Sequence, residues 1–343
     1  MPSRVTIKTI AKDLGISHIT VSRALSGSPR VSSKTRKMIE DHAGRLGYVK
    51  SAAAHTLRGN RSNIVGLLLP NIVNEFYARF ANALGLACAK QSHQVLIHLT
   101  GDDPETERLA LTRLREVEAR NVVMVPTPGM PRLHADLLND SRLIQFVRYR
   151  DFDLPCSRVL VSDSAAIKAA VQHLADHGHS QIAYIGADAS LSSGYKRYQA
   201  FCSGMKAAGG VMSPDSLVLG TPSFQMGYDA VTDLLSRNAM TAIVCGGFEI
   251  SNGASMACLN NGIQFRNDLA FVGYGDPSYY QWINGGFSTL RIDAEILAKK
   301  VAAIIGSNSE QESGNQTITS RAQLIIRDSS NWIKPSTTGS SCL

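Results

Sequence analysis

The chain has 343 residues, 44% of them hydrophobic and 18% charged, which is long and apolar enough to bury two cores and argues against disorder. No apolar run approaches the ~20 residues that span a bilayer, so a membrane-spanning protein is excluded. The N-terminal segment lacks the hydrophobic stretch of a secretory signal. We therefore expect a cytoplasmic protein whose six scattered cysteines are reduced.

The net charge of +7 is unevenly distributed. Residues 1–62 hold 12 Lys and Arg against 3 Asp and Glu, a net +9, whereas the rest holds 23 against 25, a net −2. A compact basic segment joined to a near-neutral body predicts a head that binds a polyanion. The alternative is a solvated basic face, which the helical pattern of this segment disfavours.

The basic segment predicts three short helices. Thr6, Ser17 and Ser32 are candidate N-caps, and Gly15 stands where a first helix would end. The apolar positions expected to face inward are Ile7, Ile10, Ala11, Leu14, Val21, Ala24, Leu25, Met38, Ile39, Ala43 and Leu46. Two helices joined by about four residues that include Gly form a helix-turn-helix, whose second helix enters the DNA major groove.

The outward residues of the second helix have the chemistry for reading DNA. Arg23 can donate two parallel bonds to a guanine, His18 can bond a base edge, and Ile19 can touch a thymine methyl group. Short hydroxyl side chains suited to phosphate oxygens are Thr20, Ser22, Ser32 and Thr35. For Thr20 and Ser22, capping and filling of the helix surface are equally good explanations.

Four stretches, VTIKTIAKDLGIS, TVSRALSG, VSSKTR and LGYV, match in order and spacing the DNA-binding domain of the LacI/GalR family of bacterial transcriptional regulators. The chain is similar to that family throughout, more weakly after this segment. The resemblance implies a DNA-binding domain over 1–50, a hinge over 51–62 and a ligand-binding and dimerisation domain over 63–343. The DNA-binding residues it implies are Thr6, Ser17, His18, Ile19, Thr20, Ser22, Arg23, Ser32, Thr35, Tyr48, Ala54 and Leu57.

The segment SAAAHTLRGN (residues 51–60) is Ala-rich but shorter than the ~12–15 residues that an isolated helix needs in water. It should therefore fold only when something docks on it. The resemblance implies a hinge helix in which Leu57 wedges into a minor-groove step. Without the resemblance, a flexible linker with an incidental Leu would be the better interpretation. Ser51 departs from the family, which usually has Asn there.

From Asn63 onward, apolar strands alternate with amphipathic helices. The predicted strands are 63–70, 94–99, 121–125, 143–147, 158–162, 181–186, 241–246 and 269–275, and the predicted helices are 74–90, 105–119, 165–177 and 195–208. Such alternation predicts βαβ units with parallel sheets, and the pattern restarts near Val161, which indicates two α/β lobes. The resemblance implies a body of periplasmic-binding-protein type, two doubly wound parallel-sheet lobes with the ligand between them.

Ligands of parallel sheets bind outside the carboxyl ends of the strands. The candidate effector-binding residues that follow predicted strands are Asn71, Phe76, Tyr77, Arg148, Arg197, Phe248 and Asp276. The resemblance implies that Phe76 and Tyr77 line the pocket and that Arg197 contacts the effector. For Phe76 or Phe248 taken singly, ordinary packing is the alternative.

Four residues at three places depart from the family. Gly247 and Phe248 replace a frequent Asn-Asp pair, Gly275 replaces a frequent Asp, and Arg148 stands where an acid is common. Because these acids grip sugar hydroxyls and Arg binds planar anions, we expect a sugar acid, another carboxylate or a phosphorylated metabolite in preference to a neutral sugar.

Other signals are weaker. His173 and His177 are spaced like metal ligands on a helix, but no Glu follows His173 as in H-E-x-x-H, so we expect packing and capping, with no metal and no cofactor. Asp102, Asp103 and Glu105 precede a helix and suit its N-terminus.

We therefore predict that the protein is not an enzyme but a transcriptional regulator, most simply a repressor. It is expected to bind a pseudo-palindromic operator as a homodimer and to respond to a small-molecule effector. A nucleoid-associated location follows from that role. The alternatives are a solute-binding protein without a DNA role and a sugar-metabolising enzyme with a DNA-binding-like head.

Overall fold

The computed structural model describes residues 5–48, 62–129, 135–138, 141–151, 154–237, 240–265, 267–307 and 315–333. The chain forms two compact units, residues 1–62 and 63–343, each of which is described by itself. The predicted hinge contacts Ala54 and Leu57 lie outside the described residues.

The described part of the first unit forms three helices: α1 (Ile7–Asp13), α2 (His18–Leu25) and α3 (Ser33–Arg45). The three predicted N-caps are confirmed, because the hydroxyls of Thr6, Ser17 and Ser32 each accept a backbone N–H three residues on, at 3.3, 3.1 and 3.2 Å. Thr6 forms a complete capping box, since the Thr9 hydroxyl in turn accepts the Thr6 N–H.

The core of the first unit joins the inner faces of the three helices. Its buried side chains are Ile10, Ala11, Val21, Ala24, Val31, Ile39 and Ala43. The prediction that Met38 belongs to this apolar stripe is wrong, since its side chain is 43% exposed. It lies one residue before Ile39, about 100° around the helix, and only one of the two can face the core.

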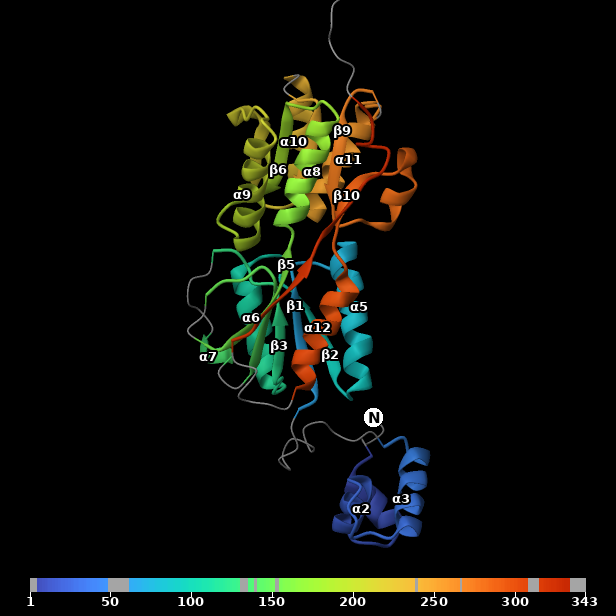
Figure 1. Cartoon of the computed structure of the whole chain (residues 1–343). Helices are drawn as coiled ribbons and strands as arrows, with labels where there is room; N and C mark the ends of the chain where they lie inside the picture. The colour runs from blue at the N-terminus through green and yellow to red at the C-terminus, as the bar shows by residue number, and fades with distance from the viewer. Residues whose placement is uncertain are drawn as a thin grey trace, which may run out of the picture. The chain divides into compact units, whose positions relative to one another are not determined.

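The first lobe of the body is a parallel six-stranded sheet of order β11-β5-β4-β3-β1-β2. Its strands are β1 (Ile64–Leu69), β2 (Gln94–Leu99), β3 (Asn121–Met124), β4 (Arg142–Val147), β5 (Cys156–Ser162) and β11 (Thr317–Arg321). The helices of this lobe are α5 (Glu75–Lys90), α6 (Pro104–Glu116), α7 (Ala135–Leu138) and α12 (Ala294–Gly306) (Figure 1). The strand β1 is buried from its second residue onward, as its unbroken apolar run predicts.

The second lobe holds a six-stranded sheet of order β12-β10-β9-β8-β6-β7. Its strands are β6 (Ile182–Ala187), β7 (Leu217–Gly220), β8 (Ala242–Gly246), β9 (Ala270–Tyr274), β10 (Ser288–Arg291) and β12 (Gln323–Ile325). Its helices are α8 (Ser164–Asp176), α9 (Ser192–Ala207), α10 (Phe224–Ser236) and α11 (Phe248–Asn260), with 3-10 turns η1 (Pro214–Ser216), η2 (Ser278–Gln281) and η3 (Ile283–Gly285). The two-lobed fold is confirmed, except that β12 runs antiparallel to β10.

The chain passes between the lobes three times (Figure 1). It leaves the first lobe after β5, returns between β10 and α12, and crosses again between β11 and β12. At the third crossing the Ala322 N–H donates to the Ser162 carbonyl at 3.0 Å, so two of the crossings are hydrogen-bonded to each other.

We predict that Gly66→Ala lowers the free energy of unfolding by about 1–3 kcal/mol, because a Cβ there would lie 2.3 Å from Cδ1 of Leu114, a fully packed residue of α6. The matched control is Gly85→Ala, in α5, where a Cβ meets nothing within 4 Å. That change should raise stability by up to about 1 kcal/mol through helix propensity. Urea unfolding of both variants checks the pair, and equal effects would contradict the close packing.

Candidate functional site

The exposed face of α2 forms a shallow depression in the first unit. Its lining residues are His18, Ile19, Ser22, Arg23, Ser26 and Ser28. Ile19 is 50% exposed, and the Arg23 side chain has no ion pair or hydrogen bond to any residue that the structure describes. The helix therefore presents an apolar contact, a cation and hydroxyls outward together.

The hydroxyl residues divide into two groups. Thr20 and Thr35 contact the capping hydroxyls of Ser17 and Ser32, with oxygen–oxygen distances of 2.9 and 2.8 Å, so the capping explanation describes them. Ser22 instead lines the depression. Tyr48, the last predicted contact of this unit, packs partly buried against the head core.

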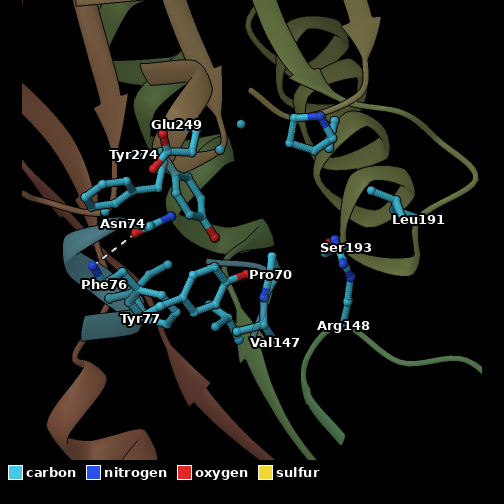
Figure 2. A pocket seen from close by; sticks show the side chains of 18 of the residues that line it. Pro70, Asn74, Phe76, Tyr77, Val147, Arg148, Leu191, Ser193, Glu249 and Tyr274 are labelled. Atoms are coloured by element: carbon cyan, nitrogen blue, oxygen red, sulfur yellow. Dashed lines mark hydrogen bonds between the residues drawn. The ribbon is translucent and has the colours of Figure 1, made fainter. Parts of the chain in front are cut away.

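A partly open cavity lies between the two lobes of the body (Figure 2). Six of the seven predicted effector residues line it, namely Asn71, Phe76, Tyr77, Arg148, Arg197 and Phe248. The lining also includes residues at the carboxyl ends of β1, β4, β6, β8 and β9, as expected for parallel sheets. The residues chosen from the sequence thus lie at the edge of each sheet that faces the cavity.

Arg197 is held by an acid at the first crossing between the lobes. Its Nε donates to Oδ2 of Asp163 at 2.5 Å, and Nη1 donates to the Gly246 carbonyl at 3.0 Å. The Tyr274 hydroxyl donates to the same Asp163 oxygen at 2.6 Å, and the guanidinium lies 4.3 Å from the centre of the Tyr274 ring. Burial acts to lower the pKa of Arg197, but the combined effect of Tyr274 and Asp163 is larger and raises the pKa above its usual value. The guanidinium therefore stays charged.

Arg148 also has a carboxylate partner. It forms an ion pair with Asp102, and its Nε donates to the Pro126 carbonyl at 2.6 Å. The expectation of an acidic effector rests on the loss of family acids and on the planar fork that Arg148 offers to an anion. In the structure Asp102 already occupies part of that fork and balances its charge, as Asp163 does for Arg197, which weakens the argument for an anionic ligand.

The departures at Gly275 and Phe248 have one structural cause. Gly275 has φ +103°, and a Cβ there would lie 2.2 Å from Cδ2 of the Phe248 ring. No Asp can therefore occupy position 275 while the ring of Phe248 stands where it does. Phe248, half-buried at the start of α11, takes the space that a carboxylate would need.

Asp276 does not line this cavity. It is buried, and its Oδ1 accepts from Nη1 of Arg327 at 2.7 Å, which ties β9 to the segment after β12. The structure therefore gives no support to the direct effector contact predicted for Asp276.

Several lining residues were missed by the sequence reasoning, which looked only just beyond each strand. They are Pro70, Asn74, Asp102, Val147, Val161, Ala187, Leu191, Ser193, Pro222, Gly246, Glu249, Tyr274 and Ile292. Asn74 also caps α5, accepting the Phe76 N–H at 3.0 Å. Tyr274 and Ala187 are the last residues of strands, a position that the same reasoning could have included.

His173 and His177 have hydrogen-bond partners of their own. His173 Nε2 lies 3.0 Å from both the carbonyl and the hydroxyl oxygen of Ser330, and His177 Nδ1 lies 2.8 Å from the His173 carbonyl. Within the described ranges, no three His, Cys, Asp or Glu side chains are grouped to hold a metal ion. Nor does any described helix have the length and apolarity to cross a membrane.

Comparison with family models gives two matches. Residues 6–51 match the model for bacterial regulatory proteins of the lacI family. Residues 62–327 match the model for periplasmic binding proteins and the sugar-binding domain of the LacI family. Together these matches cover both units of the chain.

Similar proteins are transcriptional regulators. The HTH-type regulator DegA of Bacillus subtilis is 26% identical over 333 residues, 96% of this chain and 98% of its own. GalR of Escherichia coli is 25% identical, with 87% and 88% covered. Among solved structures, a lac repressor dimer bound to operator and an anti-inducer has TM-score 0.80 at 20% identity, with 96% and 99% covered. A CelR–cellobiose complex has TM-score 0.69 at 21% identity, with 95% and 100% covered.

We predict that Asp163→Asn lowers the free energy of unfolding by about 3–5 kcal/mol, because it leaves the buried Arg197 charge without a counter-ion. The control is Asp293→Asn, at the exposed N-cap of α12, where Asn caps as well as Asp and stability should be unchanged. Chemical denaturation measures both. A small loss at position 163, equal to that at 293, would contradict the buried ion pair.

Proposed function

The chain belongs to the LacI family of bacterial regulatory proteins, and from this we propose that it represses transcription as an effector-responsive homodimer on a pseudo-palindromic operator. The observation that carries the proposal is the face of α2 on which Ile19, Ser22 and Arg23 line one depression, with Ile19 half exposed. A helix-turn-helix places such a helix in the major groove, where these side chains meet base edges.

In this proposal the residues of the head have separate roles. Arg23 binds a guanine with two parallel bonds, Ile19 packs on a thymine methyl group, and His18 bonds a base edge. The capping residues Thr6, Ser17 and Ser32 orient the N-termini of their helices and offer hydroxyl groups to DNA phosphates. Further contacts to the DNA backbone come from Thr20, Ser22, Thr35 and Tyr48. Ala54 and Leu57 make the minor-groove contacts of a hinge, with Leu57 as the wedge.

A second copy of the chain is the partner we propose for the edge of the first lobe. β2 is the edge strand of its sheet, and Leu96, Ile97 and Leu99 are exposed on it, Leu99 by 47%. Exposed apolar side chains on a sheet edge are costly in a free monomer. One helix-turn-helix reads few base pairs, so a two-fold dimer on a palindrome gives the needed affinity.

The interlobe cavity is the effector site in this proposal, and regulation follows from its position between two lobes joined at three crossings. A ligand held by both lobes stabilises one relative orientation of them, and DNA holds the dimer in an orientation of its own. The coupling is reciprocal: whatever change the effector makes in operator affinity, the operator makes in effector affinity. A cytoplasmic, nucleoid-associated location follows from this role.

The test of the DNA role is a gel-shift titration against a palindrome selected from random duplexes. We predict that Arg23→Ala weakens binding by about 1–3 kcal/mol and relaxes preference at one base position in each half-site. The control is Arg45→Ala, an exposed arginine at the end of α3 outside the depression, which should leave base preference unchanged. An equal loss on every sequence from Arg23→Ala would instead indicate a phosphate contact.

For the dimer we predict that Leu99→Lys raises the dimer dissociation constant roughly tenfold or more, because a charge would be buried in the interface without a partner. Specific DNA affinity should fall with it. Val211→Lys, at an exposed apolar position in the second lobe, is the control and should change neither. Analytical ultracentrifugation measures the constant, and an unchanged dimer in Leu99→Lys would rule out this edge as the interface.

A further inference from the structure

Four charged residues line the interlobe cavity, namely Asp102, Arg148, Arg197 and Glu249, and Asp163 lies next to them outside the lining. Arg148 and Arg197 each form an ion pair with a carboxylate of their own, Asp102 and Asp163. The remaining charged residue of the lining is Glu249. Once the two pairs are set aside, the described residues of the cavity leave one carboxylate uncompensated.

Glu249 lies in the first turn of α11, is half-buried and lines the cavity (Figure 2). Among the residues that the structure describes, no cation and no hydrogen-bond donor contacts its carboxylate. Burial raises its pKa, which reflects the cost of holding this charge away from water. The helix N-terminus offsets part of that cost.

The walls beside Glu249 are aromatic and apolar. Phe76, Tyr77, Phe248 and Tyr274 line the cavity together with Leu191 and two prolines. Burial raises the pKa of Tyr77, and smaller electrostatic effects on it come from Arg148, Asp102, Arg197 and Glu249. Tyr77 is therefore close to all four charged residues of the lining. Aromatic faces bind organic cations through their ring quadrupoles, most strongly where water is excluded.

We propose that the effector carries a protonated amine on an apolar or ring-shaped body, with the ammonium group against Glu249 and the body between the aromatic side chains. This assignment rests on the proposed function of the cavity. An acid would add a second uncompensated negative charge beside Glu249. A neutral polyol would give the carboxylate hydrogen bonds but would leave its charge uncompensated and the apolar walls poorly covered.

The test uses three small probes of one shape, 4-fluorobenzylamine, 4-fluorobenzyl alcohol and 4-fluorobenzoate, which are cationic, neutral and anionic at neutral pH. Their affinities for the full chain are measured by fluorine NMR line broadening. We expect the amine to bind roughly tenfold more tightly than either of the others, the size of effect typical of a charge-assisted hydrogen bond.

Two variants assign that preference to Glu249. Glu249→Gln should remove the advantage of the amine while leaving the affinity of the alcohol unchanged, and it should not lower the melting temperature, since no partner is lost. Glu295→Gln is the matched control, because it removes the same charge from the first turn of α12 at an exposed position outside the cavity. It should leave all three affinities as they were.

A third variant, Ser193→Trp, fills the cavity from the start of α9 and should abolish binding of all three probes. Tighter binding of the acid or the alcohol, no binding of the amine, or an amine preference that survives Glu249→Gln would each overturn the assignment. None of these results bears on the DNA role, which the gel-shift titration tests without any probe. Failure of the ligand class and failure of the proposed regulator are thus separate outcomes.

Discussion

Asp163 is the residue on which the architecture of the cavity depends. It is the first residue after β5, at the point where the chain leaves the first lobe, and its carboxylate accepts from both Arg197 and Tyr274 of the second lobe. A buried guanidinium is tolerable only with such a counter-ion. The side chains that a ligand would touch are therefore bonded directly to a crossing, so ligand contact and lobe orientation share one set of atoms.

The pairing of charges also changes the chemistry that the sequence suggested. Read alone, Arg148 in place of an acid and the loss of neighbouring acids favoured a ligand that carries a carboxylate or a phosphate. In the structure, Asp102 forms an ion pair with Arg148, although the sequence suggested only a role at the start of a helix. The ring of Phe248 occupies the space beside Gly275. The result is a site with aromatic walls in which, among the described residues, Glu249 is the charged lining residue without an ion-pair partner.

Much of the fold followed from the sequence because its signals are local. Thr6, Ser17 and Ser32 act as N-caps within a single turn, and strands such as β1 are continuous apolar runs. The helix α11 was missed because Gly, Ser and Asn weaken its propensity and because it is buried on several sides, which removes its periodicity. The partners of Arg148 and Asp276 are 46 and 51 residues away in the chain, a distance across which spacing carries no information.

The bond between Ala322 and Ser162 has a mechanical consequence. The strands β11 and β12 belong to different sheets but are separated by a single residue, and that residue is hydrogen-bonded to the end of β5. A connection of one residue that is also hydrogen-bonded leaves the two lobes little room to separate at this point. A rotation of one lobe against the other about this connection would give displacements that grow with distance from it. A few degrees beside a bound molecule become the largest excursion at the outermost strands.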